Sequence, residues 1–172
     1  MIVLETERLR LRWLTADDAP FMFELVNDPS WIEFIGDRNV KTLDAARAYV
    51  TEKYVADYVR HGYGLNLVEL KDSGTPVGIC GLINREGLQD VDVGFAFLPR
   101  YAGCGYATES AAAVLDHGRR TLGIGRIVAI TTPNNIRSIR VLEKIGLRFE
   151  GIVRLPGDDE DLAFYAHDPN PA

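Results

Sequence analysis

FLPRYAGCGYATES, residues 97–110, joins a stretch of alternating apolar residues to an alanine-rich one through a turn that contains two glycines. The preceding VDVGFAFL is typical of a strand, and residues 106–122 are typical of a helix. Gly103 and Gly105 permit positive φ angles and let the backbone approach a ligand closely. The unpaired amides of the first helical turn point into the same space, where the helix dipole favours an anion. The stretch predicts either a phosphate or pyrophosphate site or a plain strand–helix turn.

Two other phosphate motifs do not fit this turn. GxxxxGK[ST] does not occur, which excludes a P-loop NTPase. The pair Gly103-x-Gly105 continues to Thr108 rather than to a third glycine, and no ribose-binding acid follows about 20 residues later, which disfavours a Rossmann site. Cys104 would act as a nucleophile only beside an activating base. No histidine is near Cys104 in the sequence. We interpret His61, His117 and His167 as structural or solvated residues.

The chain of 172 residues carries 25 acidic and 19 basic side chains, for a net charge of −6. This balance disfavours general attraction to nucleic acid or to anionic membranes, because either would need a basic face. It suits a cationic or amine partner. With 47% apolar and 26% charged residues and no linker or repeat, the composition predicts one globular domain over residues 1–172.

The first residues, MIVLETERLRLRWL, form no continuous apolar core and so do not resemble a signal peptide. No stretch approaches the roughly 18 apolar residues of a membrane span. The two cysteines, Cys80 and Cys104, are too few for a disulfide framework, and no metal-ligand spacing surrounds them. We expect a soluble cytoplasmic protein without a metal.

Apolar periodicity gives the order of the elements along the chain. Leu9, Leu11 and Trp13 alternate with arginines, as in a half-buried strand. The elements predicted after them are helices at about 16–27 and 42–61 separated by an irregular segment at 28–41, three strands between 64 and 98, the helix at 106–122, and a strand, a helix and two closing strands. This order predicts an α+β fold: a mixed, largely antiparallel sheet of about seven strands, with one parallel pair, flanked by about four helices.

VGFAFLPRYAGCGYATESAAAVLDHG, followed by NNIRSIRVLEKIGLRFEG, resembles the GNAT superfamily of acyl-CoA-dependent N-acyltransferases, and the resemblance covers nearly the whole chain. LETERLRLRWLTADDA and VNDPSWIEFIGD are similar to the branch of ribosomal-protein N-terminal acetyltransferases of RimJ/RimL type. The resemblance implies transfer of an acetyl group from acetyl-CoA to a primary amine, by direct attack in a ternary complex. Because Ala102 and Leu142 depart from the family pattern, a non-catalytic acyl-CoA-binding module is the alternative.

The resemblance also implies how the cofactor is held: a splayed strand pairs its main chain with the pantetheine arm, and the glycine turn binds the pyrophosphate. Ala102 stands where the family usually has Gln or Arg, and Cys104 where lysine is common, so the turn should depend on backbone amides with help from Arg100. Asn135 would meet the pantetheine arm, although helix capping also explains an asparagine there. The implied cofactor contacts are Phe95, Ala96, Phe97, Leu98, Arg100, Gly103, Cys104, Gly105, Tyr106, Ala107, Thr108, Asn135 and Ser138.

The reaction needs a base for the amine, a donor for the carbonyl oxygen and a place for the departing thiolate. Asp92 lies on the strand that leads to the turn, where family members often carry an acid; the alternative is a solvent-facing residue on the same face as Asp90. The backbone amide of Phe97 is implied as the carbonyl donor. Many relatives have a tyrosine acid where this chain has Leu142, so Ser138 is the candidate in its place.

The segment 28–41 supplies the predicted acceptor contacts. Trp31, Phe34 and Ile35 are predicted to form a wall of the acceptor pocket, with Glu33 as a second candidate base; anchoring of the loop to the core is the alternative. The sequence leaves the acceptor open between protein N-termini and small-molecule amines. It also leaves the oligomeric state open, with a homodimer as one option.

Overall fold

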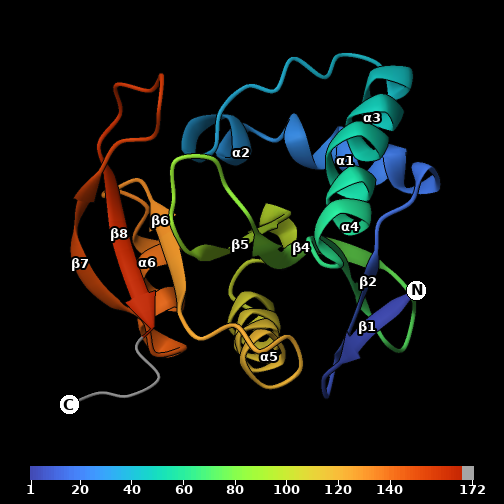
Figure 1. Ribbon diagram of the computed structural model, residues 1–172. Coiled ribbons are helices and arrows are strands. Elements are labelled where there is room, and N and C mark those ends of the chain that lie inside the picture. Colours follow the sequence, from blue (N-terminus) through green and yellow to red (C-terminus); the bar gives the residue numbers. More distant parts are fainter. Residues whose placement is uncertain (168–172) are drawn as a thin grey trace.

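A single sheet of eight strands runs through residues 1–167, the part of the chain that the computed structural model describes (Figure 1). The strands are β1 (Ile2–Glu5), β2 (Leu9–Trp13), β3 (Leu65–Leu70), β4 (Pro76–Ile83), β5 (Val91–Phe97), β6 (Ile127–Thr131), β7 (Arg148–Val153) and β8 (Leu162–His167). They lie in the order β1-β2-β3-β4-β5-β6-β8-β7, and β5–β6 is the parallel pair while the other pairs are antiparallel. The predicted α+β fold is confirmed, and β1 is the additional strand.

The helices cover both faces of this sheet. They are α1 (Ala19–Val26), α2 (Pro29–Phe34), α3 (Leu43–Tyr49), α4 (Ala56–His61), α5 (Tyr106–Arg120) and α6 (Ile136–Lys144), with the 3-10 turns η1 (Ala16–Asp18) and η3 (Pro99–Tyr101). A π-helical turn, η2 (Val50–Val55), joins α3 and α4 into the long helix predicted for residues 42–61. Across the described residues, no helix is long and apolar enough to cross a membrane.

The expectation of an irregular segment over residues 28–41 is wrong at its start, where α2 forms. Asp28 caps this helix, because its carboxylate accepts a hydrogen bond from Ser30 N at 2.9 Å, and Pro29 fits the first helical position. Trp31 is only 5% exposed and fastens the helix to the core. The cap and the buried anchor offset the weak helical tendency of a segment this short.

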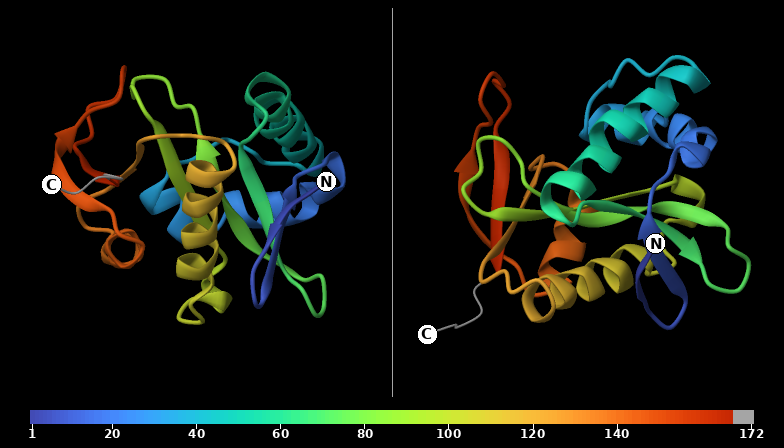
Figure 2. Two further views of the ribbon diagram at one scale, coloured as in Figure 1. Left: turned by 60° about the horizontal axis from the view of Figure 1, so that its bottom comes forward. Right: turned by 45° about the vertical axis from the view of Figure 1, so that its right-hand side comes forward.

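Two apolar clusters lie on opposite faces of the sheet. One cluster packs α5 and α6 against the strands and includes Val93, Val114 and Leu142. The other packs α1–α4 against the opposite face and includes Met22 and Tyr54. The right-hand view of Figure 2 shows the sheet between α3–α4 on one side and α5 on the other. The strands between the two layers are therefore buried from both sides.

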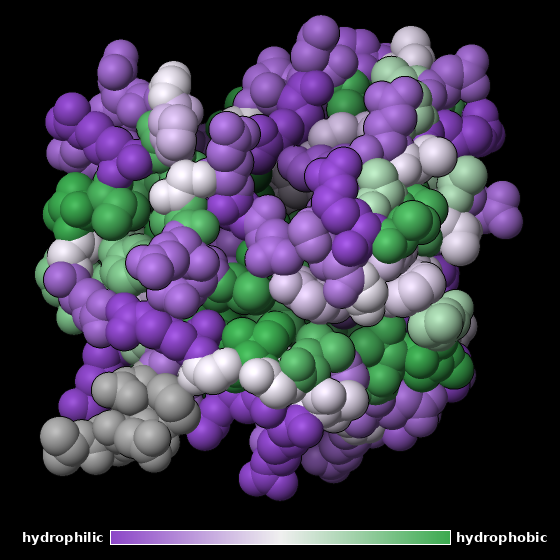
Figure 3. Space-filling view, viewed as in Figure 1, coloured by the Kyte–Doolittle hydropathy of each residue, from purple (hydrophilic) through white to green (hydrophobic). Residues whose placement is uncertain are grey.

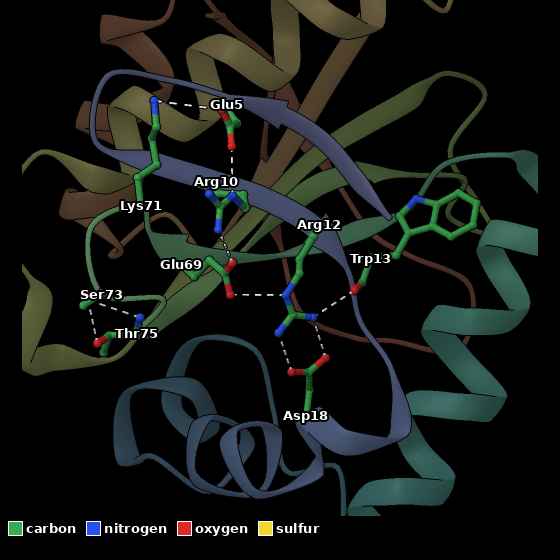
Figure 4. Close-up of polar contacts among 9 residues, drawn as sticks. All are labelled: Glu5, Arg10, Arg12, Trp13, Asp18, Glu69, Lys71, Ser73 and Thr75. Atoms are coloured by element: carbon green, nitrogen blue, oxygen red, sulfur yellow. Dashed lines mark hydrogen bonds and ion pairs between the residues drawn. The ribbon is translucent and has the colours of Figure 1, made fainter.

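Charged side chains on the first strands form a network that joins β2 to β3 and to η1 (Figure 4). The buried carboxylate of Glu69 pairs with Arg10 and Arg12, at nitrogen–oxygen distances of 3.4 and 3.2 Å. Arg12 also donates to both oxygens of Asp18, at 3.0 and 2.8 Å. These partners satisfy a carboxylate whose burial alone would be unfavourable, and they fix the first hairpin against the sheet.

The chain passes very close to itself where β4 meets the turn that follows α4. A Cβ atom at Gly81 would lie only 2.0 Å from the carbonyl oxygen of Gly64. Leu82 N donates to that same oxygen at 3.3 Å. Only glycine at position 81 allows this contact, which brings the start of β3 close to β4, where Leu65 pairs with Gly81.

Candidate active site

The two parallel strands separate soon after they meet. The structure pairs β5 with β6 only at Val91–Ile127 and Asp92–Val128. On its other edge β5 stays paired with β4 as far as Phe97, which lies opposite Gly78. Beyond Asp92, the edge of β5 that faces β6 therefore has no strand partner within residues 1–167.

Main-chain groups of β5 point into this opening. Leu98 N donates to Val77 O at 3.1 Å, on the β4 side. Because successive amides of a strand point to opposite edges, the N–H and C=O groups of Phe95 and Phe97 face the opening instead. Their side chains pack in the α5 cluster, while Ala96 packs with the helices of the other layer. The main chain at these positions thus has no strand partner on this edge among residues 1–167.

The glycine turn has the backbone conformation that its sequence requires. Gly103 and Gly105 have φ angles of 77° and 82°, which confirms the predicted positive values. Gly105 is the residue that caps the start of α5, and its carbonyl accepts from Glu109 N at 3.0 Å. The first amides of α5 have no partner within the helix, as at the start of any α-helix, and this is the arrangement that binds anions.

An arginine from the first hairpin lies against this turn, although no sequence motif pointed to it. Arg8 Nη1 donates to Cys104 O at 2.9 Å, and Arg8 pairs with Glu109 at 2.7 Å. The guanidinium carbon of Arg8 lies 4.7 Å from the centre of the Tyr106 ring. The predicted helper, Arg100, instead pairs with Glu24 of α1 and stacks on Tyr101. The guanidinium at this turn belongs to Arg8.

The two thiols are free but differ in environment. Burial raises the pKa of the Cys80 thiol to about 12, so this cysteine is not a nucleophile at neutral pH. Cys104 is exposed in the turn, and its Sγ lies 3.9 Å from Ala102 O.

Residues 1–167 contain no cluster of three or more His, Cys, Asp or Glu side chains that could hold a metal ion.

The start of α6 lies just beyond β6. The side chain of Asn135 accepts a hydrogen bond from Ser138 N at 3.3 Å, so Asn135 does cap the helix. Ser138 is half-buried in the first turn. Leu142, at the position where many relatives carry a tyrosine, is 1% exposed and packs in the α5 cluster. No acidic hydroxyl can be supplied from that position, and Ser138 is the polar side chain one helical turn earlier.

Asp92 is buried, with 1% of its surface exposed, so the solvent-facing alternative is wrong. Arg85 Nη2 lies 3.2 Å from Asp92 Oδ2, and within residues 1–167 Asp92 Oδ1 has no hydrogen-bond partner. Burial raises the pKa of Asp92, and the Arg85 guanidinium opposes that rise. Asp90, two residues earlier, instead pairs with Arg126 at 3.3 Å.

The predicted acceptor residues divide into one anchor and several accessible side chains. Trp31 is a core residue of the α1–α4 cluster, so the anchoring alternative holds for it. Phe34 is half-buried, whereas Glu33 is exposed and Ile35 is 41% exposed. These residues share with Asp92 the face of the sheet that carries α1–α4, while the glycine turn leads into α5 on the other face.

A separate cavity of about 210 Å³ lies between the N-terminal strand and α5. Apolar side chains gather in this region of the surface (Figure 3). Its lining includes Met1, Trp13, Tyr63, Asn66 and Leu122, and none of the predicted site residues lines it. The opening between β5 and β6, rather than this cavity, carries the chemistry described above.

A model of the acetyltransferase (GNAT) domain matches residues 8–148. The chain belongs to the GNAT family. The matched region of this GNAT chain runs from the first hairpin through β5, the glycine turn, α5 and α6. Members of the family use acetyl-CoA, and the chain is an acyl-CoA-dependent N-acetyltransferase.

Relatives share most of the length of this GNAT chain. The uncharacterized N-acetyltransferase YnaD of Bacillus subtilis is 30% identical over 167 residues, which cover 95% of each protein. The crystal structure of a GNAT acetyltransferase from Bacillus anthracis has a TM-score of 0.79 and 29% identity, covering 96% of this chain and 97% of that one. RimL, the ribosomal L7/L12 α-N-protein acetyltransferase solved with coenzyme A, shares the fold with a TM-score of 0.80 at 21% identity, and the match covers 98% of each chain.

Proposed function

We propose that this GNAT enzyme transfers the acetyl group of acetyl-CoA to the primary amine of a protein N-terminus or a small molecule, by direct attack in a ternary complex. The observation that carries the proposal is the position of Asp92: this buried carboxylate lies where β5 and β6 separate. It also has one oxygen with no hydrogen-bond partner among the described residues. A carboxylate of raised pKa in such a place can accept a proton from an incoming amine.

The residues around the opening fit acetyl-CoA. The free main-chain edge at Phe95 and Phe97 suits the amides of a pantetheine arm, and the positive-φ turn at Gly103 and Gly105 suits a pyrophosphate. Asn135 caps the start of α6, the helix that follows β6, and β6 is the strand on the other side of the opening from β5. When bound, acetyl-CoA supplies an activated acetyl group as a thioester. The full set of residues proposed to hold it is Phe95, Ala96, Phe97, Leu98, Arg100, Gly103, Cys104, Gly105, Tyr106, Ala107, Thr108, Asn135 and Ser138.

Three groups of the chain then have distinct tasks. Asp92 removes a proton from the amine, directly or through a water molecule. The backbone N–H of Phe97 donates to the carbonyl oxygen, where negative charge grows during acyl transfer. The hydroxyl of Ser138 donates to the sulfur as it departs. Trp31 holds α2 in place so that Glu33, Phe34 and Ile35 can border the acceptor.

We also propose that the enzyme belongs to the RimJ/RimL branch and works in the cytoplasm. The opening motifs of the chain and the likeness of fold to RimL support the branch. The two free thiols suit a reducing compartment. The net charge of −6 suits a cationic acceptor, as protein N-termini and polyamines are.

The test is turnover of acetyl-CoA, followed by release of the CoA thiol, against peptide N-termini, polyamines, amino acids and aminoglycosides. Direct attack predicts intersecting lines in a two-substrate initial-rate plot and no acetylated enzyme by mass spectrometry. Parallel lines with an acetyl-enzyme would contradict direct attack.

The non-catalytic module remains the second candidate, because Leu142 fills the position of the usual acid with a core side chain. Tight binding of CoA without transfer to any acceptor would favour the module. Failure to bind CoA at all would refute both candidates.

A further inference from the structure

The glycine turn lacks the side chains that would hold an anion directly. Ala102 and Cys104 carry neither an amide nor a cation, and Arg100 is paired with Glu24. Binding at this turn should therefore depend mainly on backbone N–H groups, with Arg100 able to contribute only when it leaves Glu24. Such groups contribute only when they point toward the ligand, so whatever fixes the orientation of the peptide planes controls the affinity.

One peptide plane of the turn is fixed by Arg8. Its Nη1 donates to Cys104 O at 2.9 Å, from the side of the first hairpin. The peptide bonds of the described chain are trans, and in a trans peptide the C=O and the following N–H point in opposite directions. Holding the Cys104 carbonyl toward Arg8 therefore turns the Gly105 N–H away from Arg8, toward the open side of the turn.

Glu109 fixes Arg8 in turn. Its carboxylate accepts from Arg8 Nε at 2.7 Å, from Arg8 N at 2.9 Å and from Thr6 Oγ1 at 2.7 Å. Burial alone would raise the pKa of Glu109, but the hydrogen bonds from Thr6 and Arg8 outweigh it and the pKa is lowered. Glu109 thus stays charged at neutral pH and holds the β1–β2 turn against the first turn of α5.

We propose that Arg8 is a positioning residue for the acyl donor: it orients the Gly105 amide toward the pyrophosphate of acetyl-CoA and, through Glu109, links the first hairpin to the donor site. The proposal rests on the proposed function in one respect, namely that the glycine turn receives the phosphates of CoA. Arg8 compensates for the polar side chains that are absent at Ala102 and Cys104. It does so by binding the Cys104 carbonyl rather than the anion itself.

The experiment compares two donors that differ only in the part that Arg8 is proposed to serve. Acetyl-CoA contains the pyrophosphate, whereas S-acetylpantetheine ends before it. Arg8→Gln removes the guanidinium and keeps a polar side chain of similar reach. Arg10→Gln is the matched control, because Arg10 lies two residues away on the same hairpin and pairs with Glu5 and Glu69 instead.

We expect Arg8→Gln to raise the dissociation constant of CoA and the KM for acetyl-CoA by about tenfold, the effect of one charge-assisted hydrogen bond, with kcat within about twofold of wild type. The kcat/KM for S-acetylpantetheine should not change. Arg10→Gln should behave as wild type with both donors. Because Arg8 is an exposed ion-pair member, the melting temperature should fall by no more than about 4 °C.

Two results would overturn the proposal: an unchanged dissociation constant for CoA in Arg8→Gln, or an equal loss with both donors, which would indicate a merely structural role. Should Arg8→Gln not fold, Glu109→Gln provides the same test, because it releases Arg8 while Arg8 itself remains. If the wild-type enzyme itself did not bind CoA, the proposed function would be refuted. Failure of the Arg8 proposal and failure of the proposed function are therefore distinguishable.

Discussion

Gly105→Ala tests whether the turn needs glycine for its backbone angle, for the approach of Arg8, or for both. Gly105 has a φ angle of 82°, and a Cβ atom there would lie 3.3 Å from Arg8 Nη2. A left-handed angle costs an alanine about 1–2 kcal/mol. For a domain of this size that loss lowers the melting temperature by about 2–8 °C. The new methyl group also pushes the guanidinium by a few tenths of an ångström.

Gly123→Ala is the matched control at the other end of α5. Gly123 has a φ angle of 71°, and a Cβ atom there would meet nothing within 4 Å. Both variants should lose the same free energy of unfolding, measured by urea denaturation, because the angular strain is alike. Only Gly105→Ala should weaken the binding of CoA, measured by calorimetry, by about threefold to tenfold.

The reasoning fails if the two variants bind CoA equally well. It also fails if Gly105→Ala is as stable as wild type, because the left-handed angle would then carry no strain. A larger loss of stability in Gly105→Ala than in Gly123→Ala would show that moving the Arg8 guanidinium requires more free energy than expected for the end of a flexible side chain.

Three further predictions concern the base, the acid and the sheet. Asp92→Asn should lower kcat by at least about 100-fold, while Asp90→Asn changes it little; similar rates in both would remove Asp92 as the base. Because the pKa of Asp92 is raised in the folded protein, the wild-type rate should begin to fall, as the pH is lowered, at a pH above the usual pKa of aspartate. The charged carboxylate should also reduce the stability of the folded protein at neutral pH, so Asp92→Asn should melt at a higher temperature. Ser138→Ala should reduce kcat by about tenfold, and an unchanged kcat would exclude an acid role. Gly81→Ala should destabilise by about 3 kcal/mol or more in urea, since its Cβ would overlap Gly64 O at 2.0 Å; a stable variant would show that the two segments can separate.

The junction between β5 and α5 could be predicted because its signals are local. The predicted strand VDVGFAFL ends one residue beyond β5, which ends at Phe97, and the helix begins at Tyr106 as predicted. Helix α2 also has a local signal: Trp31, Phe34 and Ile35 follow helical spacing, after a capping Asp28. Short helices are missed when aromatic residues among polar ones are interpreted as a loop.

Two features of the site had no local signal. Alternation places Asp92 on one face of β5, but it does not say whether helices cover that face, so its burial became visible only in three dimensions. Arg8 and Glu109 are 101 residues apart, and each taken alone is an ordinary surface residue. The sequence therefore predicts the turn and its ligand chemistry, but not the side chain that sets the direction of its amides.

The separation of the two apolar clusters by the sheet has a consequence for how such an enzyme can change over evolutionary time. Substitutions among the helices α1–α4 reach the α5 cluster through the strands and through Tyr101, which packs against both clusters, so their effects on stability should largely add to those of substitutions on the other side. The layer that we propose to border the acceptor can then accumulate changes while the layer proposed to hold the donor stays intact. On that proposal, a lineage can acquire a new amine substrate without having to rebuild the half of the molecule assigned to the acetyl donor.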